Sequence, residues 1–142
     1  MGRIIFVLFI FVQGCNKEPV NIDDSLTEVE GFFFEKDTET PYSGPIFSLY
    51  NVDQLKEEGE LYNGKKQGFF TEWYENGQKK KEGFYENGIV SGQWAYWDEG
   101  GIKYLEESYK KGNKDGLYTL YQDGVKKRQG NYSNNIKNGS FV

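Results

Sequence analysis

The sequence predicts an all-β protein, an elongated single-layer antiparallel sheet of tandem β-hairpins. The 142 residues contain 11 Phe, 11 Tyr, 3 Trp and 18 Gly but only 3 Pro, a composition typical of short strands joined by tight turns. Glycines recur every 24 residues with apolar residues in phase, and turn-forming pairs recur at two fixed places between them. A disordered chain would be poor in aromatic residues, so we expect this chain to fold.

The glycine interval defines a unit of 24 residues. Units start near Gly44, Gly68, Gly92 and Gly116, and a partial unit starts at Gly139. Regular recurrence is the signature of a repeat protein, so we expect successive units that contact mainly their neighbours. Two apolar columns follow the glycines: Ile46, Phe70, Trp94, Tyr118 and Phe141 at the second position, and Leu49, Trp73, Trp97 and Tyr121 at the fifth.

Turn chemistry divides each unit into two strands. Residue pairs that tolerate a positive φ favour tight hairpin turns. The first unit has Val52-Asp53-Gln54 in place of such a pair, so its loop is expected to differ. The pairs are Asn76-Gly77, Gly100-Gly101 and Asp123-Gly124 within units, and Asn63-Gly64, Asn87-Gly88 and Lys111-Gly112 between them.

A two-residue turn at Asn76-Gly77 would set the register of its hairpin. It places Glu72 opposite Lys81 as a cross-strand ion pair, and Trp73 opposite Lys80 as a cation–π contact. We therefore interpret the basic run at residues 79–81 as a solvated strand whose charges are neutralised by acidic residues across the hairpin.

The second and fifth positions differ by an odd number, so in a regular strand they point to opposite faces. Either aromatic residues line both faces, or a bulge brings them together. Gly59, Gly83 and Gly130 recur in the second strand, where a bulge or a close backbone approach requires glycine, although Glu107 takes that place in the third unit.

The N-terminus predicts a targeting signal. Nine apolar residues, 4–12, follow Arg3, which is the length of a signal-peptide apolar region and too short to span a bilayer. The run ends in Val12-Gln13-Gly14-Cys15, which resembles a bacterial lipoprotein signal. The resemblance implies that residues 1–14 are removed and that Cys15 carries lipid and anchors the protein to a membrane of the cell envelope. An ordinary signal peptide and a buried free cysteine remain alternatives.

Charge is concentrated near this end of the chain. Residues 16–41 carry eight acids against Lys17 and Lys36, a net charge of −6, whereas residues 42–142 carry 14 acids and 14 bases. We therefore expect an acidic flexible tether over residues 15–30, followed by the repeat array over residues 31–142. A neutral array has no net charge with which to neutralise phosphates, so nucleic-acid binding is not expected.

The units resemble known repeats. The pattern Gly-x-aromatic-x-x-aromatic, the run Tyr-Glu-Asn-Gly-Gln at residues 74–78 and the entry Thr-Pro-Tyr-Ser-Gly-Pro at residues 40–45 are similar to MORN-repeat variants, and more closely to bacterial YwqK-family antitoxins of toxin–antitoxin systems. This resemblance covers about residues 31–142. It implies an elongated sheet of hairpins that serves as an interaction platform, with a toxin as one possible protein partner.

Catalytic chemistry is not evident in the sequence. The chain has no His and one Cys, and it shows no nucleophile–base pair, metal-ligand cluster or phosphate-binding glycine loop. The adjacent carboxylates Asp98-Glu99 and Glu106-Glu107 would point to opposite faces of a strand. We therefore expect a protein that is not an enzyme and that binds no cofactor or metal.

These observations predict a lipid-anchored protein-interaction module, with an antitoxin-like or immunity-like role by resemblance. The alternatives are an envelope or glycan-binding lipoprotein that stacks sugars on aromatic rings, and a purely structural envelope spacer. Aromatic residues are enriched at protein contacts. The candidate partner-binding residues are Phe70, Trp73, Trp94, Trp97, Tyr118 and Tyr121.

Overall fold

The computed structural model describes residues 17–140, most of which lie in β-strands. The elements are β1 (Val20–Asn21), α1 (Ile22–Ser25), β2 (Leu26–Val29), β3 (Phe32–Glu35), β4 (Gly44–Asn51), β5 (Gln54–Tyr62), β6 (Lys65–Trp73), β7 (Lys79–Glu86), β8 (Ile89–Trp97), β9 (Lys103–Lys110), β10 (Asn113–Gln122), β11 (Val125–Ser133) and β12 (Ile136–Asn138). Ten strands form one sheet in the order β1-β4-β5-β6-β7-β8-β9-β10-β11-β12, and β2 and β3 form a second, two-stranded sheet.

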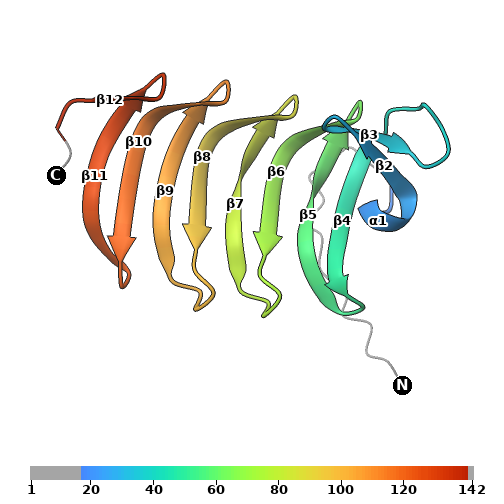
Figure 1. Cartoon of the computed structure of the whole chain (residues 1–142), viewed down its shortest axis with the longest axis horizontal. Helices are drawn as coiled ribbons and strands as arrows, with labels where there is room; N and C mark the ends of the chain where they lie inside the picture. Colours follow the sequence, from blue (N-terminus) through green and yellow to red (C-terminus); the bar gives the residue numbers. More distant parts are fainter. Residues whose placement is uncertain (1–16, 141–142) are drawn as a thin grey trace.

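The large sheet is a row of hairpins. From β4 to β12 every strand pairs antiparallel with the next strand of the chain, and only β1 runs parallel to its neighbour β4. The strands follow one another along the long axis, with α1, β2 and β3 gathered at the β4 end (Figure 1). The prediction of an all-β, largely antiparallel sheet of successive hairpins is confirmed.

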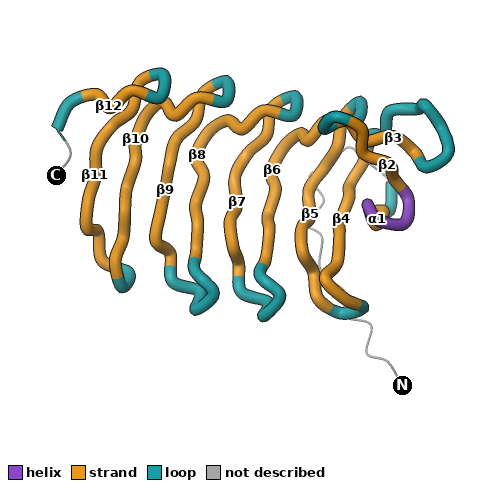
Figure 2. Tube along the Cα trace, in the orientation of Figure 1, coloured by secondary structure: helices purple, strands orange, loops and turns teal. Residues whose placement is uncertain are grey.

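Tight turns close the upper edge of the sheet in Figure 2, where one hairpin leads to the next. Asn63 and Gly64 have φ of 49° and 77°, and Asn87 and Gly88 have φ of 52° and 81°, which is the backbone of a two-residue turn with two left-handed positions. The amide of Gly64 donates to the carbonyl oxygen of Tyr42 over 2.8 Å, and that of Gly88 does the same to Lys66. These hydrogen bonds tie each turn to the preceding hairpin.

The turns at the opposite edge are less uniform. The first hairpin has a two-residue turn, with Asn51 paired to Gln54, whereas residues 74–78 form a five-residue loop between β6 and β7. The prediction of a two-residue turn at Asn76-Gly77 is therefore wrong. A register shift between Glu72 and Trp73 also places Trp73 opposite Lys79 and not Lys80.

Three of the glycines that start the predicted units occupy bulged backbone. Gly68, Gly92 and Gly116 have φ of 84°, 66° and 108°. Each lies at a shift in the pairing with the preceding strand. A bulge with a left-handed residue strongly favours glycine, which explains the recurrence of this residue within otherwise regular strands.

The N-terminal segment differs from the predicted tether. Residues 20–29 form β1, α1 and β2, and Leu26 is buried in a cluster with Phe33, Ile46 and Leu61. Apolar residues hidden among the acids therefore provide the buried area that orders this part, which a charge count overlooks. The row of hairpins begins at β4 rather than at residue 31, because β3 pairs with β2 instead and only β1 of the N-terminal segment joins the large sheet. The predicted signal peptide at residues 1–14, the lipid-bearing Cys15 and the column residue Phe141 lie outside the described residues.

Candidate interaction surface

Aromatic residues line both faces of the sheet, which resolves the alternative left open by the sequence. The register shift between Glu72 and Trp73 places the extra residue, Lys80, on β7, so β6 itself runs without an inserted residue from Phe70 to Trp73. Phe70 and Trp73 therefore point to opposite sides. We call the two sides the Phe70 face (with Ile46, Leu61, Tyr85, Trp94 and Glu107) and the Trp73 face (with Phe69, Phe84, Trp97 and Tyr121).

The rings of Phe70 and Trp94 are taken up by packing within the protein. Both residues are only 2% exposed. A Cβ at Gly59 would lie 2.5 Å from the Phe70 ring, and a Cβ at Gly83 would lie 2.2 Å from the Trp94 ring, so each ring fills the space above a glycine of the preceding hairpin. The expectation that Phe70 and Trp94 contact a partner is therefore corrected, because these rings are not accessible.

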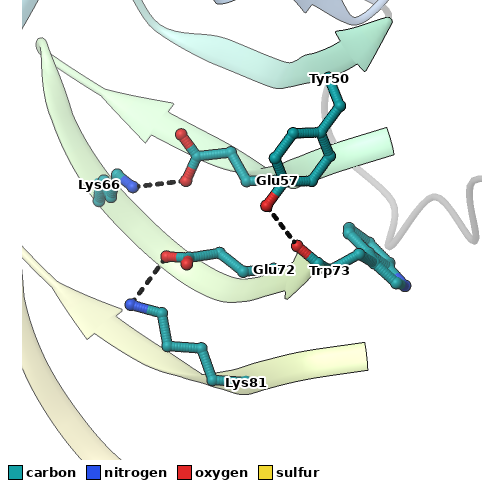
Figure 3. A network of polar contacts seen from close by, with 6 residues as sticks. All are labelled: Tyr50, Glu57, Lys66, Glu72, Trp73 and Lys81. Atoms are coloured by element: carbon teal, nitrogen blue, oxygen red, sulfur yellow. Dashed lines mark hydrogen bonds and ion pairs between the residues drawn. The ribbon is translucent and has the colours of Figure 1, made fainter. Parts of the chain in front are cut away.

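Edge-to-face contacts and ion pairs continue this packing along the Phe70 face. Tyr85 lies between Phe70 and Trp94, with ring centroids 5.1 and 5.0 Å away. The predicted pair of Glu72 and Lys81 is confirmed at 2.8 Å (Figure 3), and Lys81 also lies 5.7 Å from the centre of the Trp94 ring. The face is thus an internally satisfied, cohesive layer.

Glu107 replaces the glycine in the third unit by forming a polar network. This residue is 4% exposed, and its carboxylate accepts hydrogen bonds from Tyr109, over 2.6 Å, and from Lys114. Burial and the hydrogen bond to Glu107 raise the pKa of Tyr109. Tyr118 of β10 lies opposite Glu107 and is partly buried. Less of its ring is therefore accessible to a partner than the sequence predicts.

The Trp73 face keeps aromatic surface accessible. Trp73, Trp97 and Tyr121 are partly buried. Phe69 and Phe84 form a cross-strand pair on the same face and are 58% and 41% exposed. Phe69 and Phe84 were missed in the sequence because no other unit has an aromatic pair at these positions.

Two lysine–carboxylate pairs accompany the rings of this face. Lys79 Nζ lies 2.5 Å from a Glu82 oxygen and 5.1 Å from the centre of the Trp97 ring. Lys103 lies 2.5 Å from Glu106 and 5.1 Å from the centre of the Tyr121 ring. Each ammonium group is therefore held between a carboxylate and an aromatic ring.

Glu106 receives a second hydrogen bond. The Tyr121 hydroxyl donates to Glu106 over 2.7 Å. Burial alone would raise the pKa of Glu106, but the hydrogen bonds from Lys103 and Tyr121 outweigh it and lower the pKa below its usual value.

Glu58 lies one unit before Glu82 and two units before Glu106, but its surroundings differ from theirs. It pairs with Thr71 as Glu106 pairs with Thr119. However, the residue three positions before Glu58 is Leu55, whereas lysines stand three positions before Glu82 and Glu106. Its Oε2 atom is buried and has no hydrogen-bond partner. Burial raises the pKa of Glu58, and the charge of Lys79 opposes this shift only in part.

Hydrogen bonds from two tyrosine hydroxyls connect successive hairpins near their closed ends. The Tyr50 hydroxyl donates to the Trp73 carbonyl oxygen over 3.0 Å (Figure 3), and the Tyr74 hydroxyl donates to that of Trp97 over 2.9 Å. The backbone of both tryptophans is thereby anchored to the preceding hairpin, which keeps the Trp73 face in one arrangement.

Residues 17–140 contain no group of three or more His, Cys, Asp or Glu side chains placed to hold a metal ion. Within the same residues, no helix is both long and apolar enough to cross a membrane. Comparison of the sequence with protein-family models and with curated proteins finds no match.

Proposed function

We propose that the protein is a tandem array of 24-residue, MORN-like hairpin units that binds a protein partner through the Trp73 face, anchored to a membrane by lipid on Cys15. Contacts that recur one unit apart support the proposed tandem array. Lys79 and Glu82 in one hairpin have the same geometry as Lys103 and Glu106 in the next, as the stacking of identical units requires.

The accessible aromatic surface is the observation that carries the binding proposal. Phe69 and Phe84 expose 58% and 41% of their surface on the same face as the partly buried Trp73. Lys79 and Lys103 are already paired with carboxylates, so covering the face does not bury an uncompensated ammonium group. Aromatic residues are enriched among the anchors of protein interfaces.

The fitting partner is a protein that presents apolar side chains to Phe69 and Phe84. Within the family that the sequence resembles, such a partner is a toxin, and the mechanism is occlusion: the face covers the active surface of the toxin. No group of this chain needs to react for that purpose, which agrees with a role as a non-catalytic antitoxin or immunity protein.

The test is affinity capture with the full chain in nonionic detergent. Wild type should retain one partner in a stoichiometric amount, and Phe69→Asp combined with Phe84→Asp should lose it. Val52→Asp serves as the control, because Val52 is 88% exposed and lies in the loop between β4 and β5. Equal capture by all three proteins would contradict binding through the Trp73 face.

The lipid anchor needs a separate test. Growth with labelled palmitate should label the wild-type chain, and Cys15→Ser should abolish the label. Label that survives the substitution would refute attachment at Cys15 without affecting the proposed binding face.

Glycan binding is the second candidate, and Trp73 is the residue that favours it. Lys79 and Lys103 lie over the rings of Trp97 and Tyr121 and so compete with a sugar for those rings. The partly buried Trp73 ring is the better candidate for stacking on this face. Retention on peptidoglycan that disappears with Trp73→Ala would favour this function over protein binding.

A further inference from the structure

One end of the molecule is acidic. Residues 17–41 carry eight carboxylates against Lys17 and Lys36, and all of these acids except Glu35 are exposed. The ion pairs seen in the described residues lie between Glu57 and Lys114, so none of them neutralises this end.

The opposite end is basic. Asp123 is the last acid in the sequence, and residues 124–140 contain only basic charges. The charges are exposed; three of them lie near the start of β11, and the fourth lies on β12. Because β12 pairs only with residues 131–133 of β11, the outer edge of β11 beside the three basic residues pairs with no other strand of the described part. Val125 and Ile136 add apolar surface, with 69% and 71% exposed. The basic residues are Lys126, Lys127, Arg128 and Lys137.

The two ends cannot neutralise each other within one molecule. They lie at opposite ends of the long axis (Figure 1), and ten strands at about 4.8 Å spacing separate them by roughly 40 Å. The Debye length at physiological ionic strength is about 8 Å, so each end acts as an independent charged surface.

We propose that these surfaces bind each other between copies of the chain: the β11–β12 end of one molecule docks on the acidic α1–β3 end of the next. Both ends are also edges of the large sheet, at β12 and β1, and unpaired strand edges favour association. The contact joins two different surfaces, so it is heterologous and leaves one free end of each kind, which extends the row of strands into a chain of molecules.

A charge-swap experiment on the full chain in nonionic detergent tests this contact. One variant makes both ends acidic, with Lys126→Glu, Lys127→Glu and Arg128→Glu, which change the charge of residues 124–140 from +4 to −2. The other makes both ends basic, with Glu18→Lys, Glu28→Lys, Glu30→Lys and Glu39→Lys, which change the charge of residues 17–41 from −6 to +2. Lysine is tolerated at the left-handed Glu30, since Lys111 has nearly the same φ, 51° against 52°. The control carries Lys110→Glu and Lys111→Glu, two exposed lysines away from both ends.

Sedimentation velocity distinguishes the outcomes. Wild type and the control should form large species in about 0.01 M salt and revert to monomers in about 1 M salt, where the Debye length falls from about 30 Å to about 3 Å. Each swapped variant alone should remain monomeric. A mixture of the two should again form large species, because every contact between them is complementary, and this recovery shows that both variants are folded.

Three results would overturn the proposal. The first is a wild type that stays monomeric in low salt up to its solubility limit. The second is a swapped variant that associates alone as wild type does. The third is monomeric wild type that binds phosphatidylglycerol vesicles while the variant with two acidic ends does not, which would assign the basic end to an anionic membrane surface instead.

Discussion

The indole ring of Trp94 occupies the space in which a side chain on Gly83 would lie, because a Cβ there would come within 2.2 Å of the ring. Trp94 lies on β8 and Gly83 lies on β7, and these two strands belong to neighbouring hairpins. A missing side chain on one strand thus admits a large ring from the next, and Trp94 is only 2% exposed as a result. In a sheet whose hairpins stand in a single row, this contact supplies apolar burial between units.

Gly83→Ala is expected to destabilise the protein by about 1–3 kcal/mol, because the added methyl group overpacks the contact with Trp94. Urea unfolding measures the change in the free energy of unfolding. In a Trp94→Leu background the same substitution should cost much less, since the ring that it meets is gone. An equal cost in both backgrounds would show that the glycine is required for its backbone and not for the ring.

Glu58→Gln is expected to stabilise the protein at pH 7 by less than about 1 kcal/mol, because the side chain is only partly buried and solvent screens its charge. Burial raises the pKa of Glu58 in the folded protein, although Lys79 opposes the shift. The protonated carboxyl is therefore favoured by folding, and this contribution to stability is lost as the pH rises through the raised pKa. Unfolding at pH 4 and pH 7 should show the advantage of the glutamine variant only at pH 7.

The control for Glu58 is Glu82→Gln. The Glu82 carboxylate is 2.5 Å from Lys79, so removing its charge should lower the stability at pH 7 rather than raise it. If Glu58→Gln and Glu82→Gln changed the free energy of unfolding in the same direction at pH 7, the presence of Leu55 in place of a lysine would not explain the behaviour of Glu58.

The recurring glycines and aromatic residues were sufficient to predict the all-β sheet of hairpins, because a bulge at positive φ and an apolar column both leave a periodic trace in the sequence. They were not sufficient to predict which rings are buried. Phe70 and Trp94 lie over Gly59 and Gly83 of the preceding hairpins, and this depends on a register between hairpins that no local pattern encodes.

The length of the loop between β6 and β7 and the structure of the N-terminal segment were also not predicted from the sequence. Asn76-Gly77 has the chemistry of a two-residue turn, yet the chain forms a five-residue loop in which the Tyr74 amide donates to the Gln78 carbonyl oxygen over 2.8 Å. In the acidic segment, Leu26 and Phe33 are buried while the surrounding carboxylates remain at the surface. Net charge averages over these two kinds of residue and so predicts a tether where the structure has folded elements.

Glu106→Gln is expected to destabilise the protein at pH 7 by about 0.5 kcal/mol, because the ion pair is partly exposed. Burial would raise the pKa of Glu106, but hydrogen bonds from Lys103 and Tyr121 lower it overall. A lowered pKa contributes stability above the unfolded value of about 4.3 that is lost as the pH falls through the folded value. The difference between wild type and variant should therefore shrink on going from pH 7 to pH 3.

The matched substitution is Glu99→Gln, in an exposed loop, which should change the free energy of unfolding by clearly less than Glu106→Gln at pH 7 and by the same amount at both pH values. A similar loss for Glu99 and Glu106 would point to a general effect of net charge, and not to the contact with Lys103 and Tyr121.

Leu26→Ala is expected to destabilise the protein by about 2–4 kcal/mol, as is usual when a buried leucine is truncated. Leu26 is 7% exposed and packs in the cluster that contains Phe33 and Ile46, so the loss would show that the acidic segment is part of the folded unit. Val29→Ala is the control, since Val29 is 54% exposed on the same strand and should change the stability by less than about 0.5 kcal/mol. Equal and small effects of the two substitutions in urea unfolding would mean that residues 20–29 do not contribute to the core, and would restore the flexible tether that the charge pattern predicts.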